Sequence, residues 1–175
     1  MTTAALALLM SGAITAPAAS ASSTSAVSSD EPTLPEAPKM VVSIEKLGKT
    51  MRGVRDRTHL LTDCDAGKGG TCSIEKSFTV TRTVQVALGV SKSFVSAELN
   101  ISSSRSVTIS ARCTSPVFTS DRQVYKAFPS GSRTWYKIVK TYYKGGGKFW
   151  KREKSIPLMA FNPTGVSCLM DTKPR

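Results

Sequence analysis

Residues capable of acid–base or metal chemistry are few in this chain. His59 is its one histidine, and it precedes a segment, 62–71, that is rich in turn-forming Asp and Gly. A Ser/His/Asp arrangement needs a histidine that a carboxylate orients, but a lone histidine is more often a surface or structural residue. Asp63 and Asp65, followed by Gly67, imitate the start of a calcium loop, yet the later ligands and the closing glutamate are absent. We therefore expect no catalytic residue, no metal, no cofactor and no enzymatic activity.

The cysteines are the second set of chemically informative residues. Their number is even and no Cys-x-x-Cys pair occurs, which favours disulfides over a zinc site. Four cysteines permit three pairings. We expect one bridge between Cys64 and Cys72, which would close a Gly-rich loop. We expect a second between Cys113 and Cys168, which would tie a strand end to the C-terminal end of the chain.

Cationic and aromatic side chains alternate through the last third of the chain. Ten of the 12 aromatic residues fall between Phe118 and Phe161, and residues 122–154 carry ten basic side chains against one acid, Glu153. Cations attract phosphates and anionic headgroups, while aromatic rings lie at membrane interfaces. The candidate residues for binding an anionic surface are Arg133, Lys137, Lys140, Lys144, Lys148, Trp150, Lys151 and Arg152. A soluble sheet with solvated lysines explains the same residues.

Two segments that alternate between apolar and polar residues predict long strands. From Ile74 to Val90, seven of the nine even-numbered positions are apolar, and 107–113 alternates in the same way. A period of two with many β-branched residues is typical of a strand with one buried face. Between these strands, the apolar spacing predicts a short helix with Ser91 as its N-cap and Asn100 as its stop, although Val95 and Leu99 also fit a strand of shifted register.

Turn residues and apolar runs predict the elements that position the basic aromatic stretch. Segments 123–128 and 134–143 predict strands, and the three glycines at 145–147 reverse the chain into 148–156 as a hairpin. Turn formers then punctuate the end of the chain: Pro157, Pro163 and Gly165.

Residues 40–61 fit a helical stripe and a strand about equally well. The other elements predict a mainly β fold class. We expect an antiparallel sheet or sandwich with long Ser/Thr-rich amphipathic strands, at most one or two short helices, and disulfide staples.

The first 38 residues differ in composition from the rest. Residues 4–14 are largely apolar and Ala19-Ser20-Ala21 matches a signal-peptidase site, although no Lys or Arg precedes the apolar run. We interpret 1–21 as a signal peptide and expect its true start to lie upstream. Residues 22–38 read as a disordered Ser-, Pro- and acid-rich linker, and 39–175 as a single secreted β domain. No apolar run reaches the roughly 18 residues of a membrane-spanning helix.

The Ser/Thr-alternating run resembles part of a known class of proteins. Phe78 to Ser110 is similar to the strands of aerolysin- and epsilon-toxin-type β-pore-forming proteins, over less than a quarter of the chain. The resemblance implies a segment that rearranges into a barrel, with one face toward lipid and one toward water. An ordinary half-buried sheet explains the same alternation. The sequences Gly69-Gly70-Thr71-Cys72 and Cys113-Thr114-Ser115-Pro116 resemble small exported actinobacterial proteins, which implies an extracellular location.

These observations favour a secreted, extracellular protein of net charge +12 that binds without catalysing. We expect it to engage an anionic lipid, a wall polymer or an acidic protein through its basic aromatic hairpins. A nucleic-acid partner is not expected outside the cell. Two alternatives remain: a membrane-active aerolysin-like β protein, and a secreted enzyme inhibitor that presents the loop 64–72 to its target.

Overall fold

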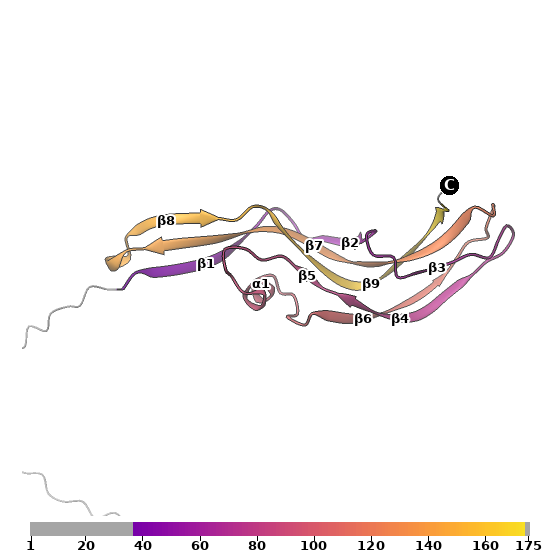
Figure 1. The fold of residues 1–175 in the computed structure, drawn as a ribbon, viewed down its shortest axis with the longest axis horizontal. Coiled ribbons are helices and arrows are strands. Elements are labelled where there is room, and N and C mark those ends of the chain that lie inside the picture. The colour runs from indigo at the N-terminus through magenta and orange to yellow at the C-terminus, as the bar shows by residue number, and fades with distance from the viewer. Residues whose placement is uncertain (1–36, 174–175) are drawn as a thin grey trace, which may run out of the picture. The chain divides into compact units, whose positions relative to one another are not determined.

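The computed structural model describes residues 37–173, and the predicted signal peptide and nearly all of the predicted linker lie outside this range. Within it the chain is mainly β, as the sequence predicts, with two antiparallel sheets, one α-helix and one 3-10 turn (Figure 1). Both predicted disulfides are present, Cys64–Cys72 and Cys113–Cys168. No helix among the described residues is long and apolar enough to cross a membrane.

The larger sheet is organised around one central strand, β7 (Gln123–Tyr143), which has 21 residues. Three strands pair in succession along one edge of β7, two pair along its other edge, and one short strand extends the sheet outward. In that order they are β1 (Lys39–Lys46), β2 (Met51–Arg55) and β3 (Thr62–Cys64), then β8 (Phe149–Lys154) and β9 (Leu158–Thr172), and finally β5 (Thr83–Val84). The described structure therefore has strands, and no helix, in the ambiguous segment 40–61.

The smaller sheet is a two-stranded ribbon of β4 (Ser73–Thr81) and β6 (Ser106–Thr114). Its register places hydroxyl side chains opposite one another on one face, with one charged pair, Glu75 and Arg112, among them. The opposite face joins a buried core cluster of Ile74, Ala111, Phe118, Tyr125 and Ala127. The strand predicted to continue to Val90 ends at Thr81, because the chain then crosses to the larger sheet as β5.

The predicted helix is present as α1 (Lys92–Glu98). The side chain of Ser91 caps it by accepting a hydrogen bond from the backbone N of Phe94 at 3.3 Å. Asn100 has a φ of 55°, in the left-handed region that ends helices. The helix contributes Val95 to a second core cluster, which includes Tyr136 from β7.

The two halves of β7 contribute to the two core clusters from opposite faces. Tyr125 and Ala127 join the core against the β4–β6 ribbon, whereas Tyr136 and Ile138 join the core against α1. Side chains alternate along a strand, so odd and even positions lie on opposite faces of the sheet. The even-numbered face near the β7–β8 hairpin is therefore the face that adjoins α1.

Segments 123–128 and 134–143 are strand, as the sequence predicts, but the break expected between them is absent because β7 continues through Pro129. The carbonyl of Pro129 accepts a hydrogen bond from the backbone N of Asp56 at 2.8 Å. In an antiparallel ladder the backbone nitrogen and carbonyl of one residue point to the same side of the strand. The nitrogen of Pro129 therefore points to the gap between β2 and β3. Proline has no N–H, and at this gap its absence removes no hydrogen bond of the ladder.

Candidate anionic-surface site

The hairpin of β7 and β8 (Figure 1) is one continuous antiparallel pair. It carries most of the predicted basic and aromatic residues. Its turn is a 3-10 turn of three glycines, Gly145–Gly147, closed by a backbone hydrogen bond from Lys144 N to Lys148 O at 2.8 Å. Gly146 and Gly147 have φ values of 74° and 71°, a conformation that favours glycine. The hairpin predicted from the three glycines is confirmed.

Trp150 occupies a β-bulge in this hairpin. Tyr142 pairs with Lys151 and Tyr143 pairs with Phe149, so Trp150 is the extra residue between the two pairs. Bulges re-aim side chains, and here the indole meets Tyr142 edge to face, with ring centroids 6.3 Å apart and an interplanar angle of 77°. Trp150 and Phe149 remain 54% and 59% exposed. The hairpin therefore holds two large rings in accessible positions.

Three cations lie against these rings. The Nζ of Lys151 is 4.7 Å from the ring centroid of Tyr142, and the Nζ of Lys144 is 5.8 Å from that of Trp150. The guanidinium carbon of Arg152 is 5.8 Å from the Phe149 ring. Each exposed cation–π contact stabilises the position of its cation by about 0.5–1 kcal/mol. These contacts therefore order the long basic side chains while the charges stay exposed. We call the following residues the tip cluster: Tyr142, Lys144, Lys148, Phe149, Trp150, Lys151 and Arg152.

One carboxylate offsets part of the charge of the tip cluster. Glu153 accepts hydrogen bonds from Lys151 Nζ at 2.8 Å and from the Tyr142 hydroxyl at 3.0 Å. The bond from Lys151, followed by that from Tyr142, holds the pKa of the Glu153 carboxyl below its ordinary value. The other cations of the tip cluster form no ion pair with a carboxylate in the described part of the chain. They supply its net positive charge.

Three of the eight predicted binding residues lie outside the tip cluster. Lys137 is half-buried and lies opposite Glu45 on β1. Lys140 is half-buried on the other face of the sheet. Arg133 lies further along β7, where its guanidinium is 5.9 Å from the Phe161 ring and its buried Nε has no hydrogen-bond partner among the described residues. The structure thus brings together five of the eight candidates.

The sequence interpretation misses Met40 as a neighbour of the tip cluster. Met40 lies opposite Tyr142 in the β1–β7 ladder and is 49% exposed. Because segment 40–61 fits a helix and a strand alike, the sequence carries no signal for this pairing. The bulge at Trp150 is also invisible in the sequence, since it is a property of two paired strands.

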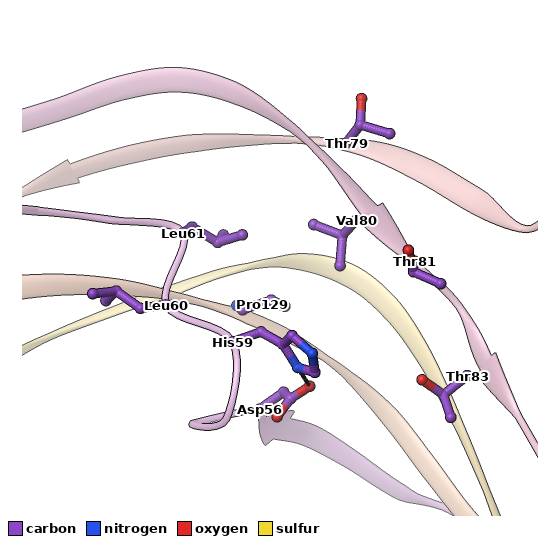
Figure 2. A pocket seen from close by; sticks show the side chains of 9 residues that line it. All are labelled: Asp56, His59, Leu60, Leu61, Thr79, Val80, Thr81, Thr83 and Pro129. Carbon is purple, nitrogen blue, oxygen red and sulfur yellow. Dashed lines mark hydrogen bonds and ion pairs between the residues drawn. The ribbon is translucent and has the colours of Figure 1, made fainter.

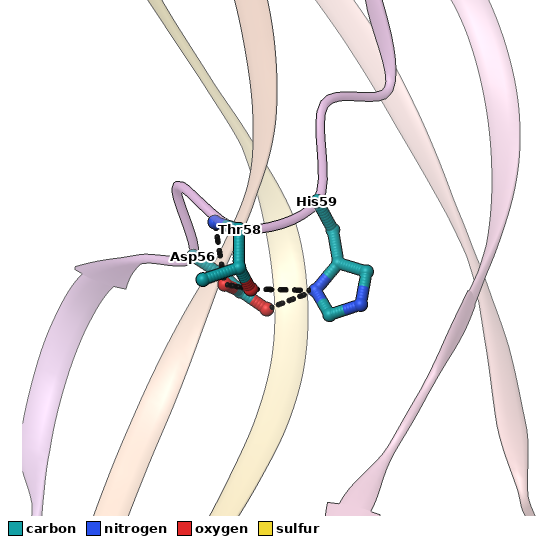
Figure 3. Close-up of polar contacts among 3 residues, drawn as sticks. All are labelled: Asp56, Thr58 and His59. Carbon is teal, nitrogen blue, oxygen red and sulfur yellow. Dashed lines mark hydrogen bonds and ion pairs between the residues drawn. The ribbon is translucent and has the colours of Figure 1, made fainter.

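A second candidate site is a cavity of about 420 Å³ between the β2–β3 loop and β4. Figure 2 shows Asp56 and His59 on the loop, with residues 79–81 of β4 across the cavity. The Nδ1 of His59 lies 2.8 Å from Asp56 Oδ2, and the hydroxyl of Thr58 donates to Asp56 Oδ1 at 2.6 Å (Figure 3).

This network fixes the orientation of the imidazole, and its one hydroxyl, that of Thr58, lies 2.9 Å from Nδ1 of the ring. Burial raises the pKa of the Asp56 carboxyl, but hydrogen bonds from Thr58 and His59 outweigh burial and leave that pKa below its ordinary value. The ionised carboxylate therefore favours the tautomer in which Nδ1 of His59 carries the proton. Nucleophilic catalysis also needs a hydroxyl or thiol bound to Nε2. In the described structure, the side-chain hydrogen bonds of the His59 ring are all at Nδ1.

No protein-family model matches the chain, and no curated protein matches it. The tip cluster combines exposure, net positive charge and aromatic surface.

Proposed function

We propose that the protein is a secreted, non-enzymatic binding protein that attaches to an anionic surface through the tip cluster. The proposal depends on the position of Trp150. This residue forms a β-bulge, its side chain is 54% exposed, and its ring lies beside the ammonium groups of Lys144 and Lys151. Amphipathic rings lie at the headgroup level of membranes, where cations meet phosphates. Among an anionic lipid, a wall polymer and an acidic protein, the exposed rings favour the lipid. The two disulfides suit an oxidising, extracellular compartment.

The attachment should be largely electrostatic. Each Lys or Arg close to an anionic leaflet contributes about 1 kcal/mol, and the tip cluster has four such side chains, one of them paired with Glu153. The sum is about 3–4 kcal/mol before any contribution from the rings. Because salt screens exposed charges over about 8 Å at physiological ionic strength, binding should weaken as the salt concentration rises.

The triple substitution Lys148→Glu, Lys151→Glu and Arg152→Glu tests the proposal. We expect it to reduce the affinity for phosphatidylserine-containing vesicles by at least about tenfold at low salt, because it reverses three charges at the contact surface. Vesicle cosedimentation measures the affinity. The matched control reverses three exposed charges elsewhere, at Lys46, Lys49 and Arg52. Unchanged binding of the tip variant, or an equal loss in the control, would contradict the proposal.

The β4–β6 ribbon supports a second candidate, a membrane-active protein of aerolysin type. The ribbon pairs with no strand of the larger sheet, and each of its strands has nine residues. A membrane-spanning strand needs about 9–11 residues, with lipid-facing and water-facing positions in alternation. The register of the ribbon keeps hydroxyl groups on one face and mainly apolar groups on the other.

The same vesicles, loaded with dye, separate the two candidates. Dye release together with heat-resistant oligomers would support the membrane-active protein. Binding that leaves the vesicles intact would support attachment alone.

A further inference from the structure

An apolar groove of about 340 Å³ lies beside the tip cluster, between β1 and the start of α1. Its lining residues are Met40, Val42, Gly89, Val90, Ser91, Phe94 and Lys140. Three of them, Val42, Val90 and Phe94, are half-buried and pack against the core cluster of α1. The apolar floor of the groove is therefore a fixed part of the fold.

The groove shares one face of the larger sheet with Tyr142 and Lys151 of the tip cluster, whereas Arg152 lies on the other face. Lys140 and Tyr142 are both even positions of β7, and Met40 lies opposite Tyr142 on β1. On the other edge of β7, Lys151 lies opposite Tyr142. A continuous path on this face therefore leads from the apolar floor, past Met40 and Lys140, to the ring of Tyr142 and the ammonium group of Lys151.

Charge is present at one end of this path. Among the residues that the structure describes, Lys140 is the one charged residue that lines the groove. Glu153 lies opposite Lys140 on β8, but it is hydrogen-bonded by Lys151 and Tyr142. A ligand that complements both ends has an anionic head and an aliphatic tail. A free phosphate would leave the apolar floor uncovered, and a neutral chain would leave Lys140 and Lys151 balanced only in part, by the single carboxylate of Glu153.

We propose that the groove receives one acyl chain of an anionic phospholipid, whose head group meets Lys140 and the tip cluster. This inference rests on the proposed attachment to anionic lipid and specifies recognition of an individual lipid molecule. The volume of the groove lies at the lower end of the roughly 300–1,000 Å³ of small-molecule sites. It therefore suits a segment of one chain.

Lysophosphatidylglycerol, used below its micelle-forming concentration, is the probe that tests the inference. We expect calorimetry with the full chain to show saturable binding of one molecule. Glycerol phosphate lacks the acyl chain, and lysophosphatidylcholine keeps the chain but has no net charge. Each should bind at least about tenfold more weakly, since each loses one of the two complementary contacts. Equal affinity for either comparison compound would overturn the inference.

Substitutions in the groove locate the binding. Met40→Gln and Lys140→Gln should each weaken binding of the lysolipid about tenfold. Met51→Gln is the matched control, because Met51 is also exposed, at 44%, but lies on β2 outside the groove. Met40→Leu restores an apolar side chain and should retain the affinity of the unchanged protein. Thermal melts verify that each variant folds, and equal affinities of the Met40→Gln and Met51→Gln variants would overturn the inference.

Vesicle binding distinguishes this inference from the proposed function. If vesicles bind through the tip cluster while the lysolipid does not bind, the groove inference fails and surface attachment stands. If neither binds, both fail.

Discussion

Tyr136 is a fully buried side chain with a hydrogen-bonded hydroxyl. The hydroxyl donates to the backbone carbonyl of Gln85, and the side-chain oxygen of Gln85 accepts from the backbone N of Met159 at 2.7 Å. Burial raises the pKa of Tyr136 to about 12. The folded protein therefore keeps this phenol protonated at a pH where an exposed tyrosine ionises.

We expect the free energy of unfolding to fall between about pH 10 and pH 12 because of Tyr136. The unfolded chain ionises its tyrosines near pH 10, whereas the folded chain holds this proton to about pH 12. The stabilisation that Tyr136 gives the folded state is complete below pH 10. It is lost as the pH rises through 12, and this loss lowers the free energy of unfolding by up to ~3 kcal/mol. Urea unfolding at about pH 9 and about pH 11 measures the decline.

Two phenylalanine variants isolate this effect from other alkaline titrations. Tyr136→Phe should show a smaller decline than the unchanged protein, because it has no buried phenol to ionise. Tyr143→Phe removes a half-exposed phenol and should leave the decline unchanged. The same decline in both variants would show that Tyr136 is not its source.

Gly131 marks a close approach between the strands β7 and β9. A Cβ at Gly131 would lie 2.1 Å from the carbonyl oxygen of Asn162 and 2.7 Å from the Cα of Pro163. Both are backbone atoms beside the bulge of β9, so neither can rotate away. At Gly165 the nearest atom to an added Cβ would be Ser130 Oγ at 3.7 Å, an ordinary contact.

Alanine substitutions at these two glycines should therefore differ in effect. Gly131→Ala should lower the free energy of unfolding by about 3 kcal/mol or more, because the two backbones must separate. Gly165→Ala should change it by about 0.5 kcal/mol or less. Urea unfolding of both variants under one condition makes the comparison. Equal losses would mean that the backbones do not approach closely at Gly131.

Strands are visible in the sequence where one face is buried and the other is exposed. The β4–β6 ribbon meets that condition, and its alternation is evident. The start of β7 is buried on both faces, at Val124 and Phe128 as well as at Ala127, so its alternation is lost. Pro129 then reads as a break, and the gap beside β2 that tolerates it is a tertiary feature.

The β9 strand is hidden for a related reason. Pro163 and Gly165 predict turns, but they flank Thr164, the extra residue of a bulge opposite β7. A bulge depends on the partner strand, so a single sequence does not reveal it.

The sequence predicts the hairpin that carries the candidate site. It does not predict which side chains of the hairpin lie together. A regular hairpin that starts from the Tyr143–Phe149 pair would set Arg152 opposite Lys140. The bulge shifts the register by one residue, so Glu153 takes that place. This shift places Glu153 on the even-numbered face of β7, beside Lys140 and Lys151. It places Arg152 on the opposite face of the sheet. Which face of the sheet each cation occupies therefore depends on how β7 and β8 pair. The spacing of the cations along one strand does not determine it.

In the described part of the chain, the two sheets are joined by side chains and not by a shared ladder of backbone hydrogen bonds. Neither strand of the β4–β6 ribbon pairs with the larger sheet. Cys113–Cys168 joins β6 to β9, and Cys64–Cys72 joins β3 to the residue before β4. Their sequence separations are 55 and 8 residues. The first bridge therefore restricts the unfolded chain more than the second does.

Removal of Cys113–Cys168 by paired serine substitutions should destabilise the protein more than removal of Cys64–Cys72. The chain-entropy model gives losses of about 4 and about 2.5 kcal/mol, and urea unfolding compares the two variants. Amide hydrogen exchange locates the effect, since loss of the first bridge should lower protection in β4 and β6 more than in β7. Equal losses of stability, with protection lowered evenly over both sheets, would mean that core contacts alone hold the ribbon in place.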